Sequence, residues 1–417
     1  MTLLTDRQGE HAVEGVALDT IAQRFGTPCY VYSKAALVDA FDQYRHAFGA
    51  RDHRILYAVK ANSNLAILKL FNDLGSGFDI VSGGELARVL AAGADPSRIV
   101  FSGVGKSRAG IEQALAARIY CFNVESEAEL ERLSQLAAGC GCSANVSLRV
   151  NPDVDARTHP YISTGLRQDK FGIPHEQALA LYRKANRLPG LHIAGIDCHI
   201  GSQLTTATPF AAALERVLAL ADALRSEGIA IEHLDVGGGL GIRYRPEDEP
   251  PSIEQYVHAL TARLGERRLR IMVEPGRSMV GNAGLLLTRV EYLKVTPERC
   301  FVVVDAAMND LIRPALYDAW HEIRPLNRRS SEAARLCQVV GPVCESGDFI
   351  GRDRMLSVEA DDLVAVLSAG AYGMSMSSNY NSRPRAAEVI VDGDRVHLVR
   401  ARESIAELYA RESFLPD

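Results

Sequence analysis

Lys60 is the residue whose type and position most suggest chemistry. It comes directly after the apolar run ILYAV (55–59) and is followed by Ala and Asn. A lysine in such a partly desolvated place has a lowered pKa and can act as a nucleophilic amine. A lysine at a strand end can equally extend its charged end into water without any catalytic role. Lys60 alone therefore leaves both interpretations open.

A run of three glycines, Gly237–Gly239, directly follows HLDV (233–236). Without side chains, their backbone N–H groups can approach an anion such as a phosphate. A tight turn that needs positive φ would use glycines as well. No nucleotide site is predicted. The pattern G-x-G-x-x-G fails because residue 242 is Ile, and GVGKS (103–107) lacks the first glycine of a P-loop.

Glu274 and Arg277 lie in MVEPGRS (272–278), after another apolar run. A carboxylate beside a pyridine nitrogen would keep that nitrogen protonated and so help the ring to accept electrons. An ion pair between the two residues would explain them without a cofactor. His199, in DCHIGSQ (197–203), could stack on a planar cofactor, although a lone histidine is more often a hydrogen-bonded core residue. Together these residue types suit a cofactor site better than a hydrolytic one.

The candidate residues end short apolar runs that alternate with amphipathic stretches at helical spacing. The eight runs are ILYAVKAN (55–62), GFDIVSGGE (77–85), RIVFSGVGK (98–106), IYCFNVES (119–126), NVSLRVNP (145–152), IAGIDCHIGSQ (193–203), HLDVGGGLGI (233–242) and RIMVEPGRSM (270–279). Eight β-then-α units over about 230 residues match a (β/α)₈ barrel, although a doubly wound open sheet uses the same alternation. Because eight is the closing number and no topological break shows, we expect a TIM barrel over residues 36–279. Barrel active sites form where strands end, so Lys60, Glu85, His199 and Glu274 should converge there.

After about residue 280 the helical periodicity fades and strand-like runs follow. They are LLLTRVEYLKV (285–295), FVVVDAAM (301–308), RLCQVVGPV (335–343), DLVAVLSAG (362–370) and AEVIVDGDRVHLV (387–399). The V-D-G-D in the last run is a plausible hairpin turn. TPCYVYS (27–33) is another strand-like run, which can join the same sheet from the N-terminal side. The sequence thus predicts a mainly β domain built from residues 1–35 and 280–417.

Three polar segments stand out among the strands of this second domain: MNDLIRPALYDAW (308–320), GPVCESGDF (341–349) and GAYGMSMSSNYNSRPR (370–385). Arg313 and Tyr317 are four apart, so they share a face if their segment is helical. Cys344 beside Glu345 offers an acid and an amine-binding carboxylate. A buried thiol next to a surface charge is the alternative.

Composition excludes several classes of protein. The 417 residues are 47% hydrophobic and 24% charged with a net charge of −6, and no run of like charges forms a basic patch for nucleic acid or a membrane surface. The first fifteen residues carry charges where a signal peptide needs an apolar core, and no apolar stretch approaches the roughly 18 residues of a membrane span. The eight cysteines show neither a C-x-x-C pair nor the histidine spacing of a zinc site. We therefore expect a reduced, cytoplasmic protein without a disulfide framework or a metal.

Taken together, the motifs resemble the fold-type III decarboxylases that depend on pyridoxal 5′-phosphate (PLP), and within them the diaminopimelate decarboxylases. The resemblance runs from about Tyr30 to Arg385. It is carried by YAVKAN, HIGSQ, GGGLGI, EPGRS, MNDLIRPALY, CESGDF and GAYG…SNYNSRPR. It implies a barrel plus a β domain, PLP as cofactor, and a homodimer whose active sites are shared across the interface.

The resemblance also implies a role for each candidate residue. Lys60 would hold PLP as a Schiff base, and either Lys60 or Cys344 would return a proton to the substrate. The cofactor would be held by Lys60, His199, Ser202, Gly237, Gly238, Gly239, Glu274, Gly276, Arg277 and Tyr372. The substrate would be held by Arg277, Arg313, Tyr317, Glu345 and Tyr372. Cys344 and Glu345 would reach into the active site of the partner subunit.

The implied reaction removes the carboxylate at the D centre of meso-2,6-diaminopimelate and yields L-lysine and CO₂. The far end of this substrate is a zwitterion, which needs a cationic and a carboxylate partner, and Arg277, Arg313 and Glu345 supply both signs. A guanidinium–carboxylate pair contributes about 1.5–3 kcal/mol. Decarboxylation of ornithine, arginine or carboxynorspermidine, or alanine racemisation, is the alternative within the group. A non-catalytic PLP-binding protein is the alternative from another class, which the presence of Lys60 and Cys344 disfavours.

Overall fold

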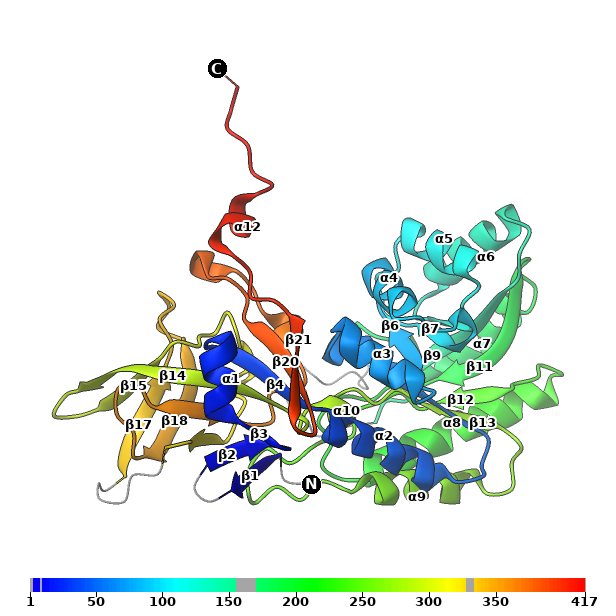
Figure 1. The fold of residues 1–417 in the computed structure, drawn as a ribbon. Helices are drawn as coiled ribbons and strands as arrows, with labels where there is room; N and C mark the ends of the chain where they lie inside the picture. Colours follow the sequence, from blue (N-terminus) through cyan, green and yellow to red (C-terminus); the bar gives the residue numbers. More distant parts are fainter. Residues whose placement is uncertain (1–2, 8–9, 155–169, 328–333, 417) are drawn as a thin grey trace. The chain divides into compact units, whose positions relative to one another are not determined.

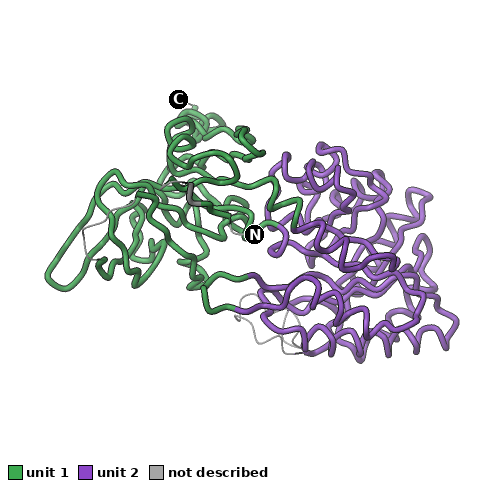
Figure 2. Tube along the Cα trace, turned by 60° about the horizontal axis from the view of Figure 1, so that its bottom comes forward, with its two compact units in different colours: residues 1–39, 243–248, 280–417 green, residues 40–242, 249–279 purple. Residues whose placement is uncertain are grey.

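The structure is a computed structural model that describes residues 3–7, 10–154, 170–327 and 334–416. Two compact units divide the chain (Figure 2). The barrel unit comprises residues 40–242 and 249–279, and the β unit comprises residues 1–39, 243–248 and 280–417. The sequence did not lead us to expect residues 243–248 in the β unit. Among the described residues, no helix combines the length and the apolar character that crossing a membrane would require.

Eight parallel strands form a closed barrel in the barrel unit (Figure 1). They are β5 (His53–Ala58), β6 (Gly77–Ile80), β7 (Ile99–Phe101), β8 (Cys121–Val124), β9 (Ala144–Asn151), β11 (Leu191–Asp197), β12 (His233–Asp235) and β13 (Arg270–Val273). The sheet closes because β13 pairs with β5 and β8 pairs with β9, while the short β10 (Ile173–Pro174) extends it beside β9. The eight predicted runs coincide with these strands, and the (β/α)₈ barrel is confirmed.

Helices alternate with the barrel strands: the first precedes β5, and each later one begins after the loop that follows a strand. They are α2 (Lys34–Phe48), α3 (Leu65–Asp73), α4 (Gly83–Ala91), α5 (Arg108–Ala117), α6 (Glu127–Gly139), α7 (His175–Ala185), α8 (Thr208–Ser226) and α9 (Ile253–Leu264), with short turns η1 (Val59–Ala61), η2 (Pro96–Arg98) and α10 (Arg277–Val280). Ser82, Ser107, Ser126 and Ser252 cap four of them, each accepting a backbone N–H from the first turn. These caps fix where each loop ends, and so they limit the freedom of the side chains that the loops carry.

The β unit is built on a large mixed sheet in the order β18-β17-β15-β14-β4-β20-β21, with β19 also paired to β14 and β16 paired to β19. The strands are β4 (Cys29–Ser33), β14 (Gly284–Val295), β15 (Cys300–Val304), β16 (Ile323–Pro325), β17 (Arg335–Val340), β18 (Phe349–Leu356), β19 (Leu363–Val366), β20 (Ala387–Asp392) and β21 (Arg395–Arg400). Strand β4 pairs antiparallel with β14 and parallel with β20, so the N-terminal strand joins the C-terminal sheet as predicted. The V-D-G-D hairpin is also confirmed, because β20 and β21 pair up to Asp392 and Arg395 and Gly393 has φ +62°.

Smaller elements complete the β unit. They are a three-stranded sheet of β1 (Leu4–Arg7), β2 (Glu10–Val13) and β3 (Val16–Ala17), the helices α1 (Leu18–Phe25), α11 (Arg313–Tyr317) and α12 (Ile405–Tyr409), and the turns η4 (Met374–Met376) and η5 (Tyr380–Ser382). Apolar side chains from α1, β4, β14 and β20 share one core, which includes Leu18, Ile21, Val31, Leu285 and Val389. The sequence did not predict β18, whose centre reads G-R-D-R and interrupts the apolar pattern.

Candidate active site

The candidate residues of the barrel unit lie just beyond the carboxyl ends of four neighbouring strands. Lys60 lies in η1 after β5, and Glu274, Gly276 and Arg277 follow β13, which pairs with β5. His199 and Ser202 follow β11, and the three glycines follow β12. Since β11, β12, β13 and β5 are consecutive around the barrel, these residues share one end of it.

Lys60 is ion-paired with Asp79, which lies on β6. Its Nζ donates to Oδ2 at 2.5 Å, and the Asp79 side chain is fully buried whereas 35% of the Lys60 side chain is exposed. An opposite charge at this distance favours the ammonium form, so it acts against the desolvation on which the sequence argument relied. We did not single out Asp79 from the sequence, although an acid inside the apolar run GFDI was a visible signal.

Glu85 lies in the first turn of α4, close to the same end of the barrel. Its carboxylate accepts the N–H of Val81 at 2.7 Å. Burial raises the pKa of Glu85 to about 7, although the Val81 N–H and the Lys60 cation act in the opposite direction. A second carboxyl group near Lys60 is therefore partly protonated at neutral pH.

The glycines Gly237 and Gly238 are required by close packing as well as by the turn. Gly237 has φ +64°, and a Cβ there would lie 2.5 Å from His199 Nδ1. A Cβ at Gly238 would lie 2.2 Å from the backbone oxygen of Glu274. The N–H of Gly238 donates to His199 Nδ1 at 3.0 Å. Burial, with the Arg149 and Lys60 cations, holds the pKa of His199 well below its usual value, so this ring is neutral.

Ser202 and Arg277 contact each other directly. Arg277 Nη2 donates to Ser202 Oγ at 2.9 Å, and the guanidinium is buried at the start of α10. Gly276, one residue earlier, lets this loop approach η1, because a Cβ there would lie 3.0 Å from the Ala61 Cβ. A guanidinium beside a hydroxyl is a donor pair that suits a phosphate.

A cluster of three buried carboxyl groups surrounds Glu274. Side-chain oxygens of Asp197, Asp235 and Glu274 lie within 4.8 Å of one another. Three carboxylates at this spacing could ligate a metal ion, and the sequence did not predict such a site. Burial first, and then the like charges of the neighbours, raise the pKa of Glu274 and of Asp197 well above their usual values. Burial also raises that of Asp235 to about 6. Burial therefore favours the protonated forms of the three carboxyl groups.

Two polar side chains orient Glu274 within the cluster. Ser102 Oγ and Asn123 Nδ2 each donate to Glu274 Oε1 at 3.3 Å. Asp197 and Asp235 lie within the predicted strand runs, in IDCH and LDVGGG, but nothing in the sequence indicated that they would lie beside Glu274. Their proximity follows from the pairing of β11 with β12 and of β12 with β13, which sets the three strand ends side by side.

In the β unit, Arg313 and Tyr317 lie on the short helix α11, which agrees with their four-residue spacing. Arg313 is buried, donates from Nη1 to His321 Nε2 at 2.9 Å, and lies 4.7 Å from the ring centroid of Tyr244. His321 in turn bonds through Nδ1 to the backbone oxygen of Leu367 at 2.8 Å. Tyr244 and His321 thus hold Arg313 in place, and the sequence argument missed both.

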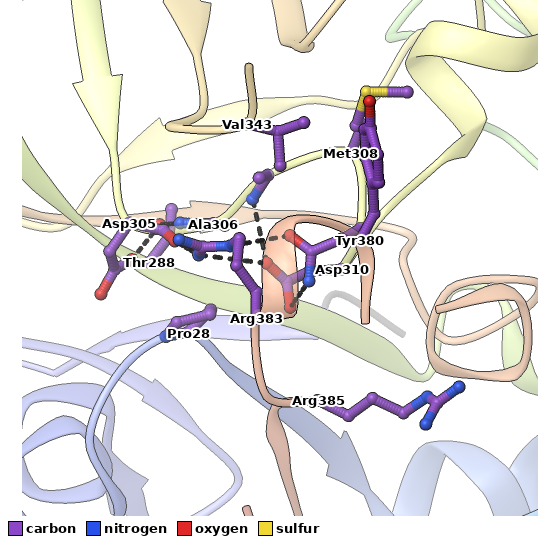
Figure 3. Close-up of polar contacts among 12 residues, drawn as sticks. Pro28, Thr288, Asp305, Ala306, Met308, Asp310, Val343, Tyr380, Arg383 and Arg385 are labelled. Carbon is purple, nitrogen blue, oxygen red and sulfur yellow. Dashed lines mark hydrogen bonds and ion pairs between the residues drawn. The ribbon is translucent and has the colours of Figure 1, made fainter. Parts of the chain in front are cut away.

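The polar segments of the β unit are tied together, as Figure 3 shows around Arg383. Arg383 Nε donates to Asn309 Oδ1 at 2.9 Å, and its Nη2 donates to the backbone oxygen of Asp305 at 2.5 Å. The carboxylate of Asp348 accepts the N–H groups of Met308 and Val343 at 2.7 and 2.8 Å. The segments around residues 308, 343 and 383 therefore form one polar assembly.

Cys344 and Glu345 lie on the surface of this assembly. Cys344 is exposed, so its alternative interpretation as a buried thiol is wrong. Its N–H donates to Asn381 Oδ1 at 2.8 Å, and Tyr380 donates its hydroxyl to Glu345 Oε1. Tyr372 is half-buried and has φ +55°, a backbone conformation uncommon for a non-glycine residue.

Known proteins share both the sequence and the fold. The family described as "Pyridoxal-dependent decarboxylase, pyridoxal binding domain" matches residues 34–281. A curated diaminopimelate decarboxylase from Pseudomonas aeruginosa is 57% identical over 416 residues, and the match covers both chains completely. The chain belongs to the diaminopimelate decarboxylase family.

Solved members of the diaminopimelate decarboxylase family have the same fold. The enzyme from Helicobacter pylori in complex with L-lysine is 44% identical with a TM-score of 0.91, and the match covers 95% of this chain and 99% of that one. The enzyme from M. jannaschii, also in complex with L-lysine, is 37% identical with a TM-score of 0.94, and the match covers 99% and 98%.

The chemistry of the barrel end fits the cofactor of the diaminopimelate decarboxylase family. It offers an amine at Lys60 for an aldehyde, the Ser202–Arg277 pair for a phosphate, and the Glu274 carboxyl for a ring nitrogen. Within the described part of the chain, Asp197 Oδ1 and Asp235 Oδ2 are buried without a hydrogen-bond partner. Buried polar atoms of this kind are expected where a polar ligand completes the hydrogen bonding.

Proposed function

We propose that this chain decarboxylates meso-2,6-diaminopimelate at its D centre to L-lysine and CO₂, with PLP as cofactor and Lys60 as the residue that holds it. The observation that carries the proposal is the pairing of β5 with β13, which sets the Lys60 amine and the Glu274 carboxyl on neighbouring strand ends. The complexes of two family members with L-lysine support the product. They also favour this substrate over ornithine or arginine.

PLP, when bound, supplies an aldehyde that an amine can join and a ring that accepts the electron pair left behind when CO₂ departs. The roles of the protein residues follow from the site. Asp79 accepts a hydrogen bond from the Lys60 ammonium and can take up the proton that Lys60 must lose to become a nucleophile. The neutral His199 ring, packed against the glycine turn, offers a flat face for stacking.

Glu274 would face the ring nitrogen of the cofactor. Burial, and then the charge of Asp235, raise the pKa of Glu274, so its protonated form is favoured when no cation faces it. Transfer of that proton to the nitrogen would leave a carboxylate facing a cation, which is a favourable buried pair. Ser102 and Asn123 would keep the receiving oxygen of Glu274 in position.

We assign Arg277, Arg313, Tyr317, Tyr372 and Glu345 to the substrate. The buried Arg313, held by Tyr244 and His321, suits the far carboxylate, and Glu345 suits the far ammonium. Cys344 or Lys60 returns the proton to the carbon that loses CO₂. Because Cys344 and Glu345 are exposed in the single chain, we assign them to the active site of a partner subunit in a homodimer. We also propose a cytoplasmic location.

The direct test is to measure CO₂ and lysine formed by the purified protein from meso-diaminopimelate, with ornithine and arginine assayed in parallel. We expect turnover of meso-diaminopimelate to exceed that of the other two at least tenfold, the lower end of what one charged pair gives. Comparable turnover of ornithine or arginine would remove the substrate assignment. Borohydride reduction of the loaded protein followed by peptide mapping should place the pyridoxyl group on Lys60, and an adduct elsewhere would remove that role.

A further inference from the structure

Helix α6 ends in a turn that brings two cysteines together. The N–H of Cys142 donates to the oxygen of Ala137 at 3.0 Å, and the N–H of Gly141 donates to that of Ala138 at 3.1 Å. Gly141 has φ +66°, so the three residues form a Schellman motif with the glycine in the left-handed position. This backbone geometry places the Sγ atoms of Cys140 and Cys142 2.7 Å apart.

The position of this Cys140–Cys142 pair makes it accessible to reagents. Cys140 is exposed and Cys142 is partly exposed. A second pair, Cys300 and Cys337, has sulfurs 3.2 Å apart on neighbouring strands, but both thiols are buried. The first pair therefore lies at the surface and the second is buried, so a dissolved reagent meets the first pair more readily.

A hollow of about 450 Å³ adjoins the surface pair. Its lining includes Cys142, Gly141, Ser143, Asn145 and Arg118. Burial first, and then Cys140, raise the pKa of the Cys142 thiol. Arg118, which is exposed at the end of α5, acts in the opposite direction and less strongly. Apolar side chains such as Leu115 and Phe122 line the rest of the hollow. A cation beside a thiol at its edge suits a sulfur reagent that carries carboxylates.

We propose that Cys140 and Cys142 form a dithiol that a small, carboxylate-bearing disulfide of the glutathione type oxidises to an intrachain disulfide. One thiolate attacks a sulfur of the reagent, which forms a mixed disulfide and releases one reagent thiol. The second cysteine then attacks the protein sulfur of the mixed disulfide and releases the other reagent thiol. The protein loses two electrons and two protons, and the reagent gains them as two thiols, so no further oxidant is needed.

This dithiol lies away from the proposed catalytic residues. Cys142 precedes β9, at the amino ends of the barrel strands, whereas Lys60 and Glu274 follow the carboxyl ends of β5 and β13. Serine at Cys140 or Cys142 should therefore leave decarboxylation unchanged. Oxidation of the pair would be a separate reaction of this chain.

The test is to incubate the reduced, cofactor-loaded protein with oxidised glutathione, block free thiols, and map the peptides by mass. We expect the peptide with Cys140 and Cys142 to lose two hydrogens and to escape blocking, while Cys300 and Cys337 become blocked after denaturation. If Cys140 and Cys142 are also blocked, or if both end as stable glutathione adducts, the proposal is overturned.

Two sets of variants sharpen the test. Cys140→Ser and Cys142→Ser should each accumulate one stable glutathione adduct, because the resolving thiol is gone. Failure of both to form an adduct would overturn the proposal.

Arg118→Gln should slow oxidation by oxidised glutathione several-fold, but it should not slow oxidation by the uncharged reagent hydroxyethyl disulfide. Arg108→Gln, an exposed arginine at the other end of α5, is the matched control and should change neither rate. Equal slowing by Arg118→Gln and Arg108→Gln would remove the role of the hollow.

Discussion

The barrel end and the polar assembly of the β unit hold their functional groups in opposite ways. In the barrel, Asp197, Asp235 and Glu274 are buried together, and burial favours their protonated forms. In the β unit, Cys344 and Glu345 are exposed, and the contacts described above hold them through a backbone N–H and one side-chain hydrogen bond. Burial can set the protonation of a group within one chain, whereas an exposed group acquires such an environment only when something covers it. Burial thus already favours one protonation state in the barrel cluster, whereas Cys344 and Glu345 are exposed in the single chain.

The largest effect should come from Lys60→Ala, which tests whether chemistry depends on the barrel end. We expect decarboxylation to fall by about 10³-fold or more, because both the covalent attachment and one route of proton return are lost. The measurement is CO₂ release from meso-diaminopimelate. Lys69→Ala is the control, since Lys69 is exposed and paired only locally with Asp73. A Lys60→Ala variant that keeps a tenth of the rate would contradict the assignment.

Lys106→Met tests whether the buried Lys106, unlike Lys60, contributes to stability rather than to catalysis. Lys106 is buried, and its Nζ donates to Glu129 Oε1 at 2.7 Å and to the oxygens of Gly103 and Asn123. Removing one partner of a buried ion pair costs about 3–5 kcal/mol, because the other charge is left unpaired. Denaturant unfolding should show this loss for Lys106→Met. The double variant with Glu129→Gln should recover part of it, and no recovery would mean that the ion pair is not the cause.

The sequence allowed the barrel to be predicted because its strands are buried on both faces and therefore read as continuous apolar runs. The same feature hid Asp79, Asp197 and Asp235. An acid inside an apolar run carries no sign of which side chains of the neighbouring strands it will face, because that depends on how the strands pair in register.

In the β unit, the polar segments could be identified from the sequence, but the residues that hold them in place could not. Tyr244 comes from residues 243–248, between two barrel elements in the sequence, and it contacts Arg313 only through tertiary packing. Asp348 holds the 308 and 343 segments through backbone N–H groups, which no side-chain pattern reveals.

Cys344→Ala tests whether the exposed thiol takes part in chemistry. We expect the rate to fall about 10²-fold, the lower end for loss of a general acid. Ser346→Ala, an exposed neighbour, should keep the full rate. Mixing Cys344→Ala with Lys60→Ala should restore up to about a quarter of the wild-type activity if sites are shared in a symmetric dimer. A full rate for Cys344→Ala would leave Lys60 as the proton donor, and a mixture without recovery would contradict shared sites.

We expect the smallest effect from Asp197→Asn, which tests, through the pH dependence of folding stability, whether burial favours the protonated forms of the three carboxyl groups. The folded pKa values of Asp197, Asp235 and Glu274 are raised, so their contribution to folding is complete below the unfolded values near pH 4. It is lost as the pH rises through the folded values, about 6 for Asp235. An amide at 197 removes one like charge, so the cofactor-free variant should be more stable than wild type by about 1 kcal/mol at pH 8, with little difference at pH 4.

Thermal unfolding across pH 4–8 measures this change in slope. Asp394→Asn, at an exposed acid of the β unit, should leave the slope unchanged. Loading PLP should flatten the wild-type slope as well, because a cation at the ring nitrogen favours the ionised cluster. If Asp197→Asn keeps the wild-type slope, the protonation of the three carboxyl groups is not coupled. The carboxyl cluster and the exposed Cys344 and Glu345 would then differ in burial alone.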